Sequence, residues 1–463
     1  MTTRTSCQLA VAVTAVAAVL APCKPAFASG FSIARFGGEY GTVIATNPTA
    51  IYYNPGALGF QGTQLYLDGQ LALRSLQWTH APGQGDSAEP VGFAGANYGT
   101  ATAFNVFGGP MLGATLKLGD VVLGAGAYAP FGGQVHFNRN ETFANTMYPG
   151  AADGVARWHS YEAKTQSIYG TVGAAVRFGP LSLGATGNVI FTTLMLNGAK
   201  VLAGSGLNDL AVEGRTYLDV SSVNASFGVG AMVEAVHDQL WFGASYQAQP
   251  ALGPMAMNGT LKLDASAASA DTVATQNVTF HQALPDVIRL GVRYRPSPKV
   301  ELRLAGDFTR WSVLQTQCLA VRDKPCTVLP DGGSAPGSGV IVNLRRYWDN
   351  TFGVRGGGSY WFSPEFEAFL GTGFETAANP DSTIEPTVAD ANNIAGAIGA
   401  RWEVARTWFL QLGYTHLQFL PRNNTGLSTL ADPATQIITR RPDGGGEYQQ
   451  WVGVIDANVA KTF

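Results

Sequence analysis

Apolar side chains alternate with arginine or glycine along residues 288–295, which read IRLGVRYR. Successive side chains of a β-strand point to opposite faces, so this stretch would have one apolar face and one face that carries arginines. The same alternation recurs at residues 65–74, 302–309 and 393–404. Segments of roughly 10 residues with this period are typical of strands that cross a membrane. A soluble β-sandwich strand alternates in the same way, so the pattern by itself leaves both folds open.

The amino-acid composition favours the membrane alternative. Of 463 residues, 46% are hydrophobic, only 13% are charged and 57 are glycine. The charged fraction is about half of that in typical soluble domains, and a disordered chain would combine low hydrophobicity with high charge. Beyond the N-terminal region no apolar run reaches the roughly 18 residues of a membrane-spanning helix. We therefore expect an all-β fold, a transmembrane antiparallel β-barrel. The net charge of −3 offers no basic surface for nucleic acid.

Residues 1–28 have the features of a secretory signal peptide. Arg4 supplies a positive charge, and residues 9–21 (LAVAVTAVAAVLA) form an apolar stretch too short to span a bilayer. Residues 26–28 (AFA) match a cleavage site, so we expect the mature chain to start at Ser29. Cys23 leaves a lipoprotein signal as the alternative.

The connections between the strand candidates alternate between short and long. Outer-membrane barrels have short periplasmic turns and long external loops, so the alternation predicts about fourteen strands with both termini on the periplasmic side. The long loop at 315–346 contains Cys318 and Cys326, which we expect to form a disulfide after export. Short breaks occur at residues 119–120, 179–180, 237–238, 296–298, 363–364 and 405–406, and long polar breaks near 81–100, 138–160, 198–215, 264–276, 315–346, 376–392 and 421–447.

The C-terminal segment supports an outer-membrane barrel. Residues 448–463 are amphipathic and end in Phe463. A terminal aromatic residue on an amphipathic last strand resembles the signal that is read by the barrel-assembly machinery. Together with the signal peptide, this segment predicts a location in the bacterial outer membrane, with outer-membrane lipid around the barrel. The strand pattern therefore assigns residues 63–463 to the barrel and its external loops.

Residues 29–62 do not follow the barrel pattern. This segment contains nine glycines and prolines but no clean alternation, and it is rich in apolar residues such as Phe31, Ile51 and Tyr52. A disordered periplasmic tail would be less apolar. We therefore favour a small plug folded into the barrel over a disordered tail.

A family resemblance begins in the same segment. Residues 30–31 (GF), 37–38 (GG) and 50–58 (AIYYNPGAL) look like the hatch of FadL-type channels, which are outer-membrane transporters of long-chain fatty acids with relatives that take up toluene and other hydrocarbons. Position 56 departs from the family pattern, which has N-P-A there, and a glycine would add flexibility. Further similar motifs follow in the family's order at residues 129–132 (APFG), 284–286 (LPD), 291–294 (GVRY), 307–312 (DFTRWS) and 380–383 (PDST).

The resemblance implies a monomeric barrel of fourteen strands whose lumen is closed by residues 29–62. It implies passive uptake of hydrophobic molecules, either fatty acids or aromatic and aliphatic hydrocarbons, which leave sideways through a kink in the third strand. The residues that match the hatch motif are Asn54, Pro55 and Ala57, and those at the kink are Pro130, Phe131, Gly132 and Gly133. Proline lacks the N–H of a strand ladder and glycine tolerates unusual backbone, which fits an opening there. A simple loop start at the strand end is the alternative.

Arginines on the polar face raise the question of ligand charge. Arg289, Arg293 and Arg303 face inward by alternation, and a guanidinium can bind a carboxylate. Acidic residues such as Asp307 and Glu367 also face inward, so pairing within the wall is the alternative. Fatty acid and neutral hydrocarbon therefore remain competing substrates.

Other functions receive less support from the sequence. The six histidines are scattered without a metal-binding spacing, so we expect no metal site, no cofactor and no enzymatic activity. An outer-membrane phospholipase would need a Ser/His/Asn site, and no matched set stands out. A general porin for polar solutes is the main alternative, but porins have no N-terminal hatch and a more charged lumen.

Overall fold

We describe the protein from a computed structural model over residues 37–38, 42–80, 89–201, 210, 213–264, 274–329, 334–429 and 443–463. The predicted signal peptide, residues 1–28, lies outside the described residues, as does the first part of the predicted hatch. No helix among the described residues is long and apolar enough to cross a membrane.

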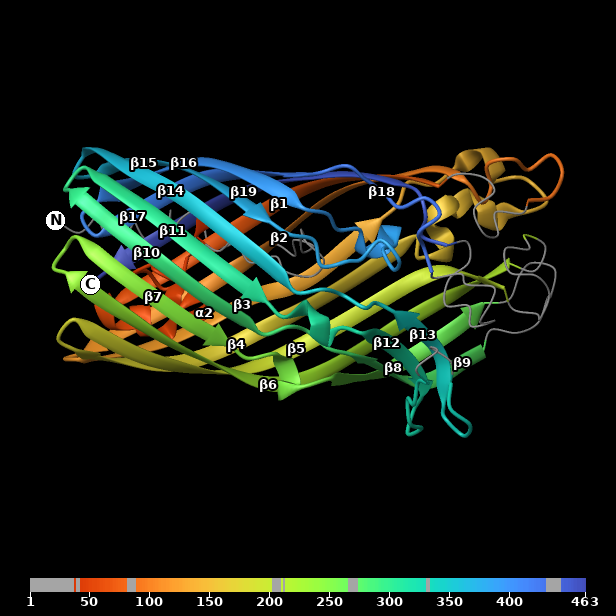
Figure 1. Ribbon diagram of the computed structural model, residues 1–463, viewed down its shortest axis with the longest axis horizontal. Coiled ribbons are helices and arrows are strands. Elements are labelled where there is room, and N and C mark those ends of the chain that lie inside the picture. Colours follow the sequence, from red (N-terminus) through yellow and green to blue (C-terminus); the bar gives the residue numbers. More distant parts are fainter. Residues whose placement is uncertain are drawn as a thin grey trace, which may run out of the picture.

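The described strands close into an antiparallel barrel, as the sequence predicted (Figure 1). Fourteen strands form the ring within the described ranges, because β19 pairs back onto β1. In ring order they are β1 (Gln64–His80), β2 (Gly99–Leu118), β3 (Val121–His136), β4 (Glu162–Phe178), β5 (Leu181–Val201), β6 (Glu213–Val236), β7 (Leu240–Gln247), β10 (Val287–Ser297), β11 (Val300–Thr309), β14 (Thr351–Ser363), β15 (Phe366–Glu375), β16 (Asn393–Ala405), β17 (Trp408–Phe419) and β19 (Glu447–Thr462).

Four ring strands are continued toward the loop end by shorter strands, after a break in each. These continuations are β8 (Met255–Asp264), β9 (Ala274–Gln282), β12 (Thr316–Val321) and β13 (Val340–Arg345). They extend the wall, since β8 pairs with β6 and β9, and β12 pairs with β9 and β13. The prediction of a loop without strands at residues 315–346 is therefore wrong, because this stretch contains the β12–β13 hairpin. The predicted break at 198–215 is shorter than expected, since β5 and β6 extend into it and pair there.

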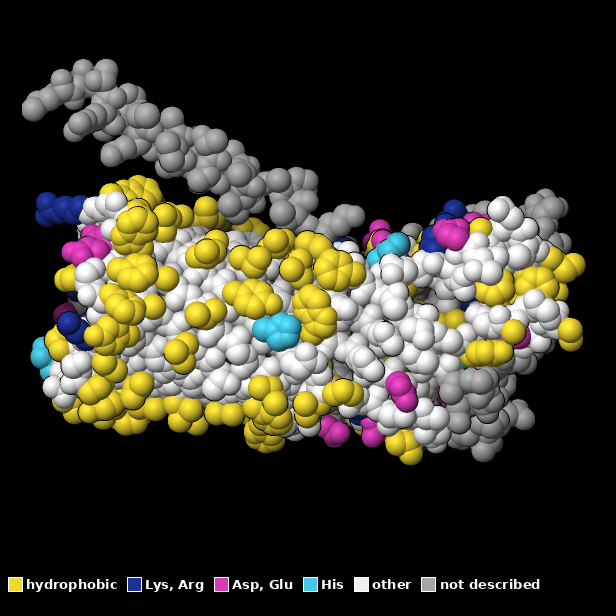
Figure 2. All heavy atoms as spheres, turned by 90° about the horizontal axis from the view of Figure 1, so that it is seen from above, with side chains coloured by type: hydrophobic (Ala, Val, Ile, Leu, Met, Phe, Trp, Pro, Cys, Tyr) yellow, Lys and Arg dark blue, Asp and Glu magenta, His cyan; other side chains and the backbone are white. Residues whose placement is uncertain are grey.

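The alternation in the sequence corresponds to the two faces of the wall. Leu290 is 61% exposed on the outer face, whereas its neighbour Arg289 is 7% exposed on the inner face. Figure 2 shows hydrophobic side chains spread over the strands on one face of the barrel, while charged side chains gather nearer its two ends. An apolar outer band of this kind is what a lipid-facing surface requires.

The segment at residues 42–62 lies inside the barrel, near the end that carries the short turns (Figure 1). We call it the inner segment. It contains a one-turn helix, α2 (Ala50–Tyr53), followed directly by the 3₁₀ helix η2 (Pro55–Phe60), and all residues of α2 are buried. The two helices pack against the inner faces of β3 to β7. The inner segment thus occupies the lumen.

The connections at the other end of the barrel are longer and carry short helices. They include η3 (Glu141–Phe143), η4 (Pro149–Asp153), η5 (Val155–Trp158) and η9 (Pro386–Val388), together with the two-residue strand β18 (Arg422–Asn423). Two further 3₁₀ helices, η7 (Pro250–Leu252) and η8 (Trp311–Val313), lie in the breaks between β7 and β8 and between β11 and β12. A disulfide joins Cys318 in β12 to Cys326 in the connection between β12 and β13.

Candidate functional site

Asn54 fixes the inner segment to the barrel wall. Its side-chain amide donates to the carbonyl oxygens of Val43 at 2.8 Å and Ala231 at 3.0 Å, and its Oδ1 accepts the N–H of Gly56 at 3.0 Å. Asn54 is fully buried. On the neighbouring strand, the hydroxyl of Ser245 donates to the carbonyl oxygen of Tyr53 at 2.6 Å. These bonds satisfy buried polar groups and so hold the turn between α2 and η2 in one place.

The inner segment contacts the wall at glycine-lined positions. A Cβ at Gly56 would lie 2.6 Å from the Cα of Ala231 and 2.7 Å from the carbonyl oxygen of Gly230. A side chain at Gly184 would likewise meet the backbone of Pro55. Gly56 was expected to add flexibility, but the structure gives it a different role, because only glycine permits this close approach of η2 to β6. Pro55 and Ala57 are buried in the same contact.

The wall has no backbone ladder between parts of β2 and β3. Their pairing ends at Leu112 and Ala127, and the register of β3 against β4 shifts between Tyr128 and Phe131. At the loop end, Asn105 on β2 forms two side-chain bonds to the backbone of β3. We call the intervening stretches, residues 106–111 of β2 and 128–135 of β3, the β2–β3 seam. Within these described residues, no strand pairing joins β2 to β3.

The predicted exit residues lie in this seam. The side chain of Asn105 donates to the carbonyl oxygen of His136 at 3.2 Å and accepts a hydrogen bond from its N–H at 3.3 Å. These two bonds mark the end of the seam nearer the long loops, which we call its upper end. Pro130, Phe131 and Gly132 are buried, and Gly133 is half-buried, so the outward–inward alternation of β3 stops there. Pro130 has no N–H to donate to a neighbouring strand. The structure therefore brings all four residues together at the one stretch of β3 that β2 does not pair with.

Aromatic side chains connect the inner segment to the seam. Tyr52 in α2 lies 5.3 Å from Tyr128, measured between ring centroids, and Tyr128 stacks on Tyr169 at 5.7 Å. Phe131 contacts Tyr169 at 6.4 Å and Trp311 at 6.2 Å. Trp311 in turn lies 4.9 Å from Trp348. We call Tyr52, Tyr128, Phe131, Tyr169, Trp311 and Trp348 the lumen aromatic cluster.

Two members of this cluster come from the strand breaks. Trp311 begins η8 between β11 and β12, and Trp348 lies between β13 and β14. Both indoles are almost fully buried. Sequence reasoning did not assign them a role, although the DFTRWS motif at residues 307–312 was a signal for the first. The breaks in the strands place both indoles in the buried cluster that also contains Tyr52 of the inner segment.

The three inward arginines differ in their partners. Arg293 pairs with Glu301 at 3.1 Å, and Arg303 pairs with the same carboxylate at 2.7 Å and with Glu367 at 3.5 Å. Arg289 has no carboxylate within 4.0 Å among the described residues, and its Nη1 has no hydrogen-bond partner there. Its guanidinium instead lies over the Tyr52 ring, 4.5 Å from the centroid. Of the three, Arg289 alone thus lacks an ion-pair partner among the described residues.

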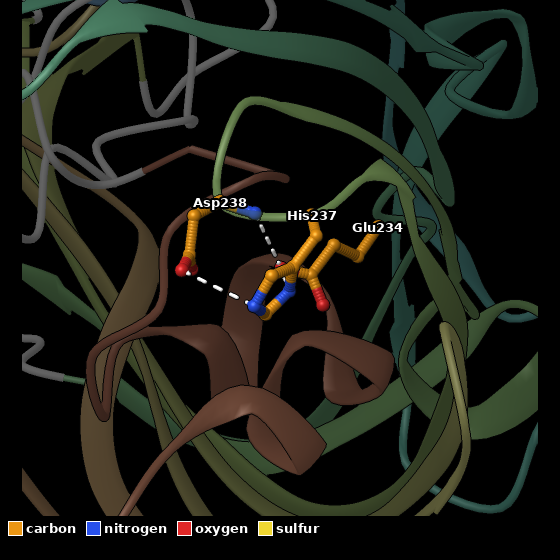
Figure 3. A group of neighbouring side chains, drawn as sticks. All are labelled: Glu234, His237 and Asp238. Atoms are coloured by element: carbon orange, nitrogen blue, oxygen red, sulfur yellow. Dashed lines mark hydrogen bonds and ion pairs between the residues drawn. The ribbon is translucent and has the colours of Figure 1, made fainter.

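One group of possible metal-binding side chains lies at the turn between β6 and β7 (Figure 3). Glu234, His237 and Asp238 bring their ligand atoms within 4.8 Å of one another. The Glu234 oxygens are already engaged, because Oε1 accepts the N–H of Asp238 at 2.9 Å and Oε2 meets Arg177 at 2.8 Å. His237 and Asp238 are largely exposed. This arrangement is that of a hydrogen-bonded turn.

Comparison with known families identifies one match. The family model described as outer membrane protein transport protein (OMPP1/FadL/TodX) matches residues 10–425. No curated protein sequence was found as a relative of the chain.

Solved structures of similar fold include three outer-membrane proteins. A FadL homologue from Pseudomonas aeruginosa has a TM-score of 0.74 and 14% identity, over 96% of this chain and 99% of that one. The toluene transporter TodX of P. putida has a TM-score of 0.63 and 14% identity, over 90% and 95% of the two chains. The toluene transporter TbuX of Ralstonia pickettii gives 0.58 and 15%, over 90% and 94%. At these low sequence identities, the similarity to the three structures is evidence of a shared fold.

Proposed function

Because the chain belongs to the OMPP1/FadL/TodX family of outer-membrane transport proteins, we propose that it admits hydrophobic molecules past a hatch and releases them sideways through its wall. The family and the barrel make it a channel of the bacterial outer membrane for uptake of hydrophobic substrates, rather than a porin for polar solutes. The hatch in this proposal is the N-terminal segment 29–62, of which the inner segment is the described part. We assign no enzymatic role, since the family is one of transport proteins.

The β2–β3 seam is the observation that most strongly supports lateral exit. A ligand inside the barrel would rest on the lumen aromatic cluster, whose member Phe131 belongs to the seam itself. Movement of the short stretch around Pro130 would open the wall without breaking a backbone ladder to β2, because within residues 106–111 and 128–135 none exists. A strand that is paired on both sides would have to lose several hydrogen bonds to open in the same way.

Lateral release also fits the chemistry of the substrate. A hydrophobic molecule that left through the periplasmic mouth would be rehydrated, which is unfavourable in proportion to its apolar surface. The inner segment blocks that mouth, with Asn54, Pro55 and Ala57 at its contact with the wall. Exit through the seam delivers the molecule directly to the lipid, so outer-membrane lipid is the acceptor in this proposal.

A tryptophan at Gly132 tests the exit. We expect Gly132→Trp to fold but to abolish uptake of radiolabelled oleate and hexadecane by cells that depend on this channel, because the indole fills the seam. The control is Gly187→Trp, which adds the same side chain on the lipid-facing side of β5, where nothing lies within 4 Å of the added Cβ. Heat-modifiable gel mobility reports folding of both variants. Parental uptake by a folded Gly132→Trp variant would refute lateral exit at this site.

A further inference from the structure

An arginine that the sequence patterns did not single out lies behind the upper end of the seam. Arg74 is on β1, faces the lumen and is 6% exposed. Its register partner on β2 is Asn105, the residue that closes the seam. The guanidinium reaches past β2, since Nη1 donates to the carbonyl oxygen of Gln134 on β3 at 3.4 Å. Arg74 therefore bridges the two sides of the seam from the inside.

The contacts of Arg74 are all with neutral groups. Nε and Nη2 donate to Oε1 of Gln450 at 3.0 and 2.6 Å, and the remaining bond is the one to Gln134. Among the described residues no carboxylate lies within the 4.0 Å of an ion pair, and Asp390 acts on Arg74 only from farther away. By contrast, Arg157, which is also buried, is paired with Glu213 at 2.9 Å.

A buried cation without a counter-ion is unfavourable, and an anionic ligand would relieve that cost. A guanidinium held in place by an amide and a carbonyl is already oriented to bind a carboxylate. The outer face of the seam adds no net charge, because Lys164 and Glu162 on β4 face Gln134 and His136 in register and offset each other. Among the described residues, the charge at the upper end of the seam that lacks an ion-pair partner is therefore that of Arg74.

The position of Arg74 also matches the way in which an amphiphile sits in a leaflet. On the outer face, at the level of the upper end of the seam, Phe104 on β2 lies 6.3 Å from Trp451 on β19, across β1, and His416 on β17 stacks on Trp451 at 5.7 Å. Aromatic side chains with polar tips mark the boundary between the apolar core of a membrane and its headgroups. The lower end of the seam, at Leu112, lies within the apolar band. A headgroup at the upper end would thus have its chain beside the lipid tails.

We propose that Arg74 binds the carboxylate of an outgoing long-chain fatty acid while the acyl chain passes through the β2–β3 seam. The proposal rests on lateral exit and deepens it, because it names long-chain carboxylates as a substrate class that the channel handles differently from neutral hydrocarbons. Arg289 lies near the other end of the seam, since it stacks on Tyr52, which contacts Tyr128. The two arginines would hold the headgroup in succession, Arg289 in the lumen and Arg74 at the wall.

Two substitutions remove the charge of Arg74 in different ways. Arg74→Gln deletes it, and Gln450→Glu places a carboxylate on the two nitrogens that now face an amide, which neutralises the guanidinium without moving it. We expect each to lower oleate uptake roughly tenfold, the effect of losing a hydrogen bond to a charged group. Hexadecane, which has no headgroup, should enter at the parental rate. Arg74→Lys should retain most oleate uptake. Arg139→Gln, in an exposed loop, is the control.

The outcomes separate this proposal from lateral exit itself. Unchanged oleate uptake in folded Arg74→Gln or Gln450→Glu overturns the role of Arg74, and so does an equal loss of oleate and hexadecane uptake. If Arg74→Gln does not fold, Gln450→Glu decides alone, and wild-type protein that transports hexadecane but not oleate also overturns the proposal. Lateral exit is judged by Gly132→Trp, which should block both substrates whatever the result at Arg74.

Discussion

At the scale of single residues, the difference between Arg289 and Arg293 predicts different effects of the same substitution. Arg289→Gln removes a guanidinium that has no ionic partner among the described residues, so we expect a folded barrel whose dissociation constant for oleate rises roughly tenfold. Arg293→Gln removes one of two partners of Glu301 and should leave oleate affinity nearly unchanged. Tryptophan fluorescence of protein in lipid nanodiscs would measure both. Equal affinities for Arg289→Gln and wild type would contradict the assignment.

Asp390, in the connection between β15 and β16, gives a prediction about pH. Burial raises the pKa of its carboxyl group from 3.8 to about 7, with Glu375 acting in the same direction and Arg422 and the N–H of Ala378 opposing it. Between these two values the folded loop holds a proton that the unfolded chain has lost, so the loop loses stability as pH rises from about 4 to about 7. We expect faster amide exchange at residues 376–392 near pH 7.5 than near pH 5.5, after correction for intrinsic rates.

Replacement of Asp390 tests the origin of that dependence. Asp390→Asn keeps an oxygen for the N–H of Ala378, which now donates to the carboxylate at 2.7 Å, but it cannot ionise. The corrected exchange of the loop should then be independent of pH over this range. Arg74 and Arg422 also act on Asp390 electrostatically, and Asp390→Asn leaves both guanidinium groups in place. A pH dependence that survives in Asp390→Asn would assign the effect to another group.

At the scale of an element, the fit of η2 against β6 depends on a single glycine. A valine at Gly56 has no room beside Ala231, so we expect Gly56→Val to displace the inner segment while the ring of strands still closes. The expected result is a higher leak of small polar dyes into liposomes that contain the variant. Gly62→Val is the matched control, because nothing lies within 4 Å of a Cβ there. Equal leak from the two variants would argue against the inner segment as the barrier.

At the scale of the whole molecule, we expect the barrel to fold independently of the segment inside it. The strands pair around the full ring without help from the inner segment, so deletion of residues 29–59 should leave a heat-modifiable barrel. Planar-bilayer recordings should then show a large and steady ion current for the deletion variant and little current for the complete protein. An intact chain that conducts as strongly as the deletion variant would instead indicate an open pore.

Local sequence patterns were sufficient to predict the architecture. Period-2 alternation at residues 288–295 set the two faces of a strand, and the spacing of short and long breaks gave the number of strands in the ring. The motifs at residues 50–58 and 129–132 marked the two segments that depart from the barrel pattern. Each of these features is encoded within a few neighbouring residues, so none of them required knowledge of which strands meet.

The contacts among these residues, in contrast, follow from the fold and could not be predicted from the sequence. Alternation placed three arginines inside, but cross-strand register decided that Arg303 meets Glu301 and Glu367 while Arg289 meets none of the described carboxylates. The seam exists because β2 stops pairing with β3 at Leu112, and Arg74 matters because its side chain reaches Gln134 from 60 positions away. Such contacts join residues far apart in the chain, and their distances follow from barrel closure and register, which no local pattern contains.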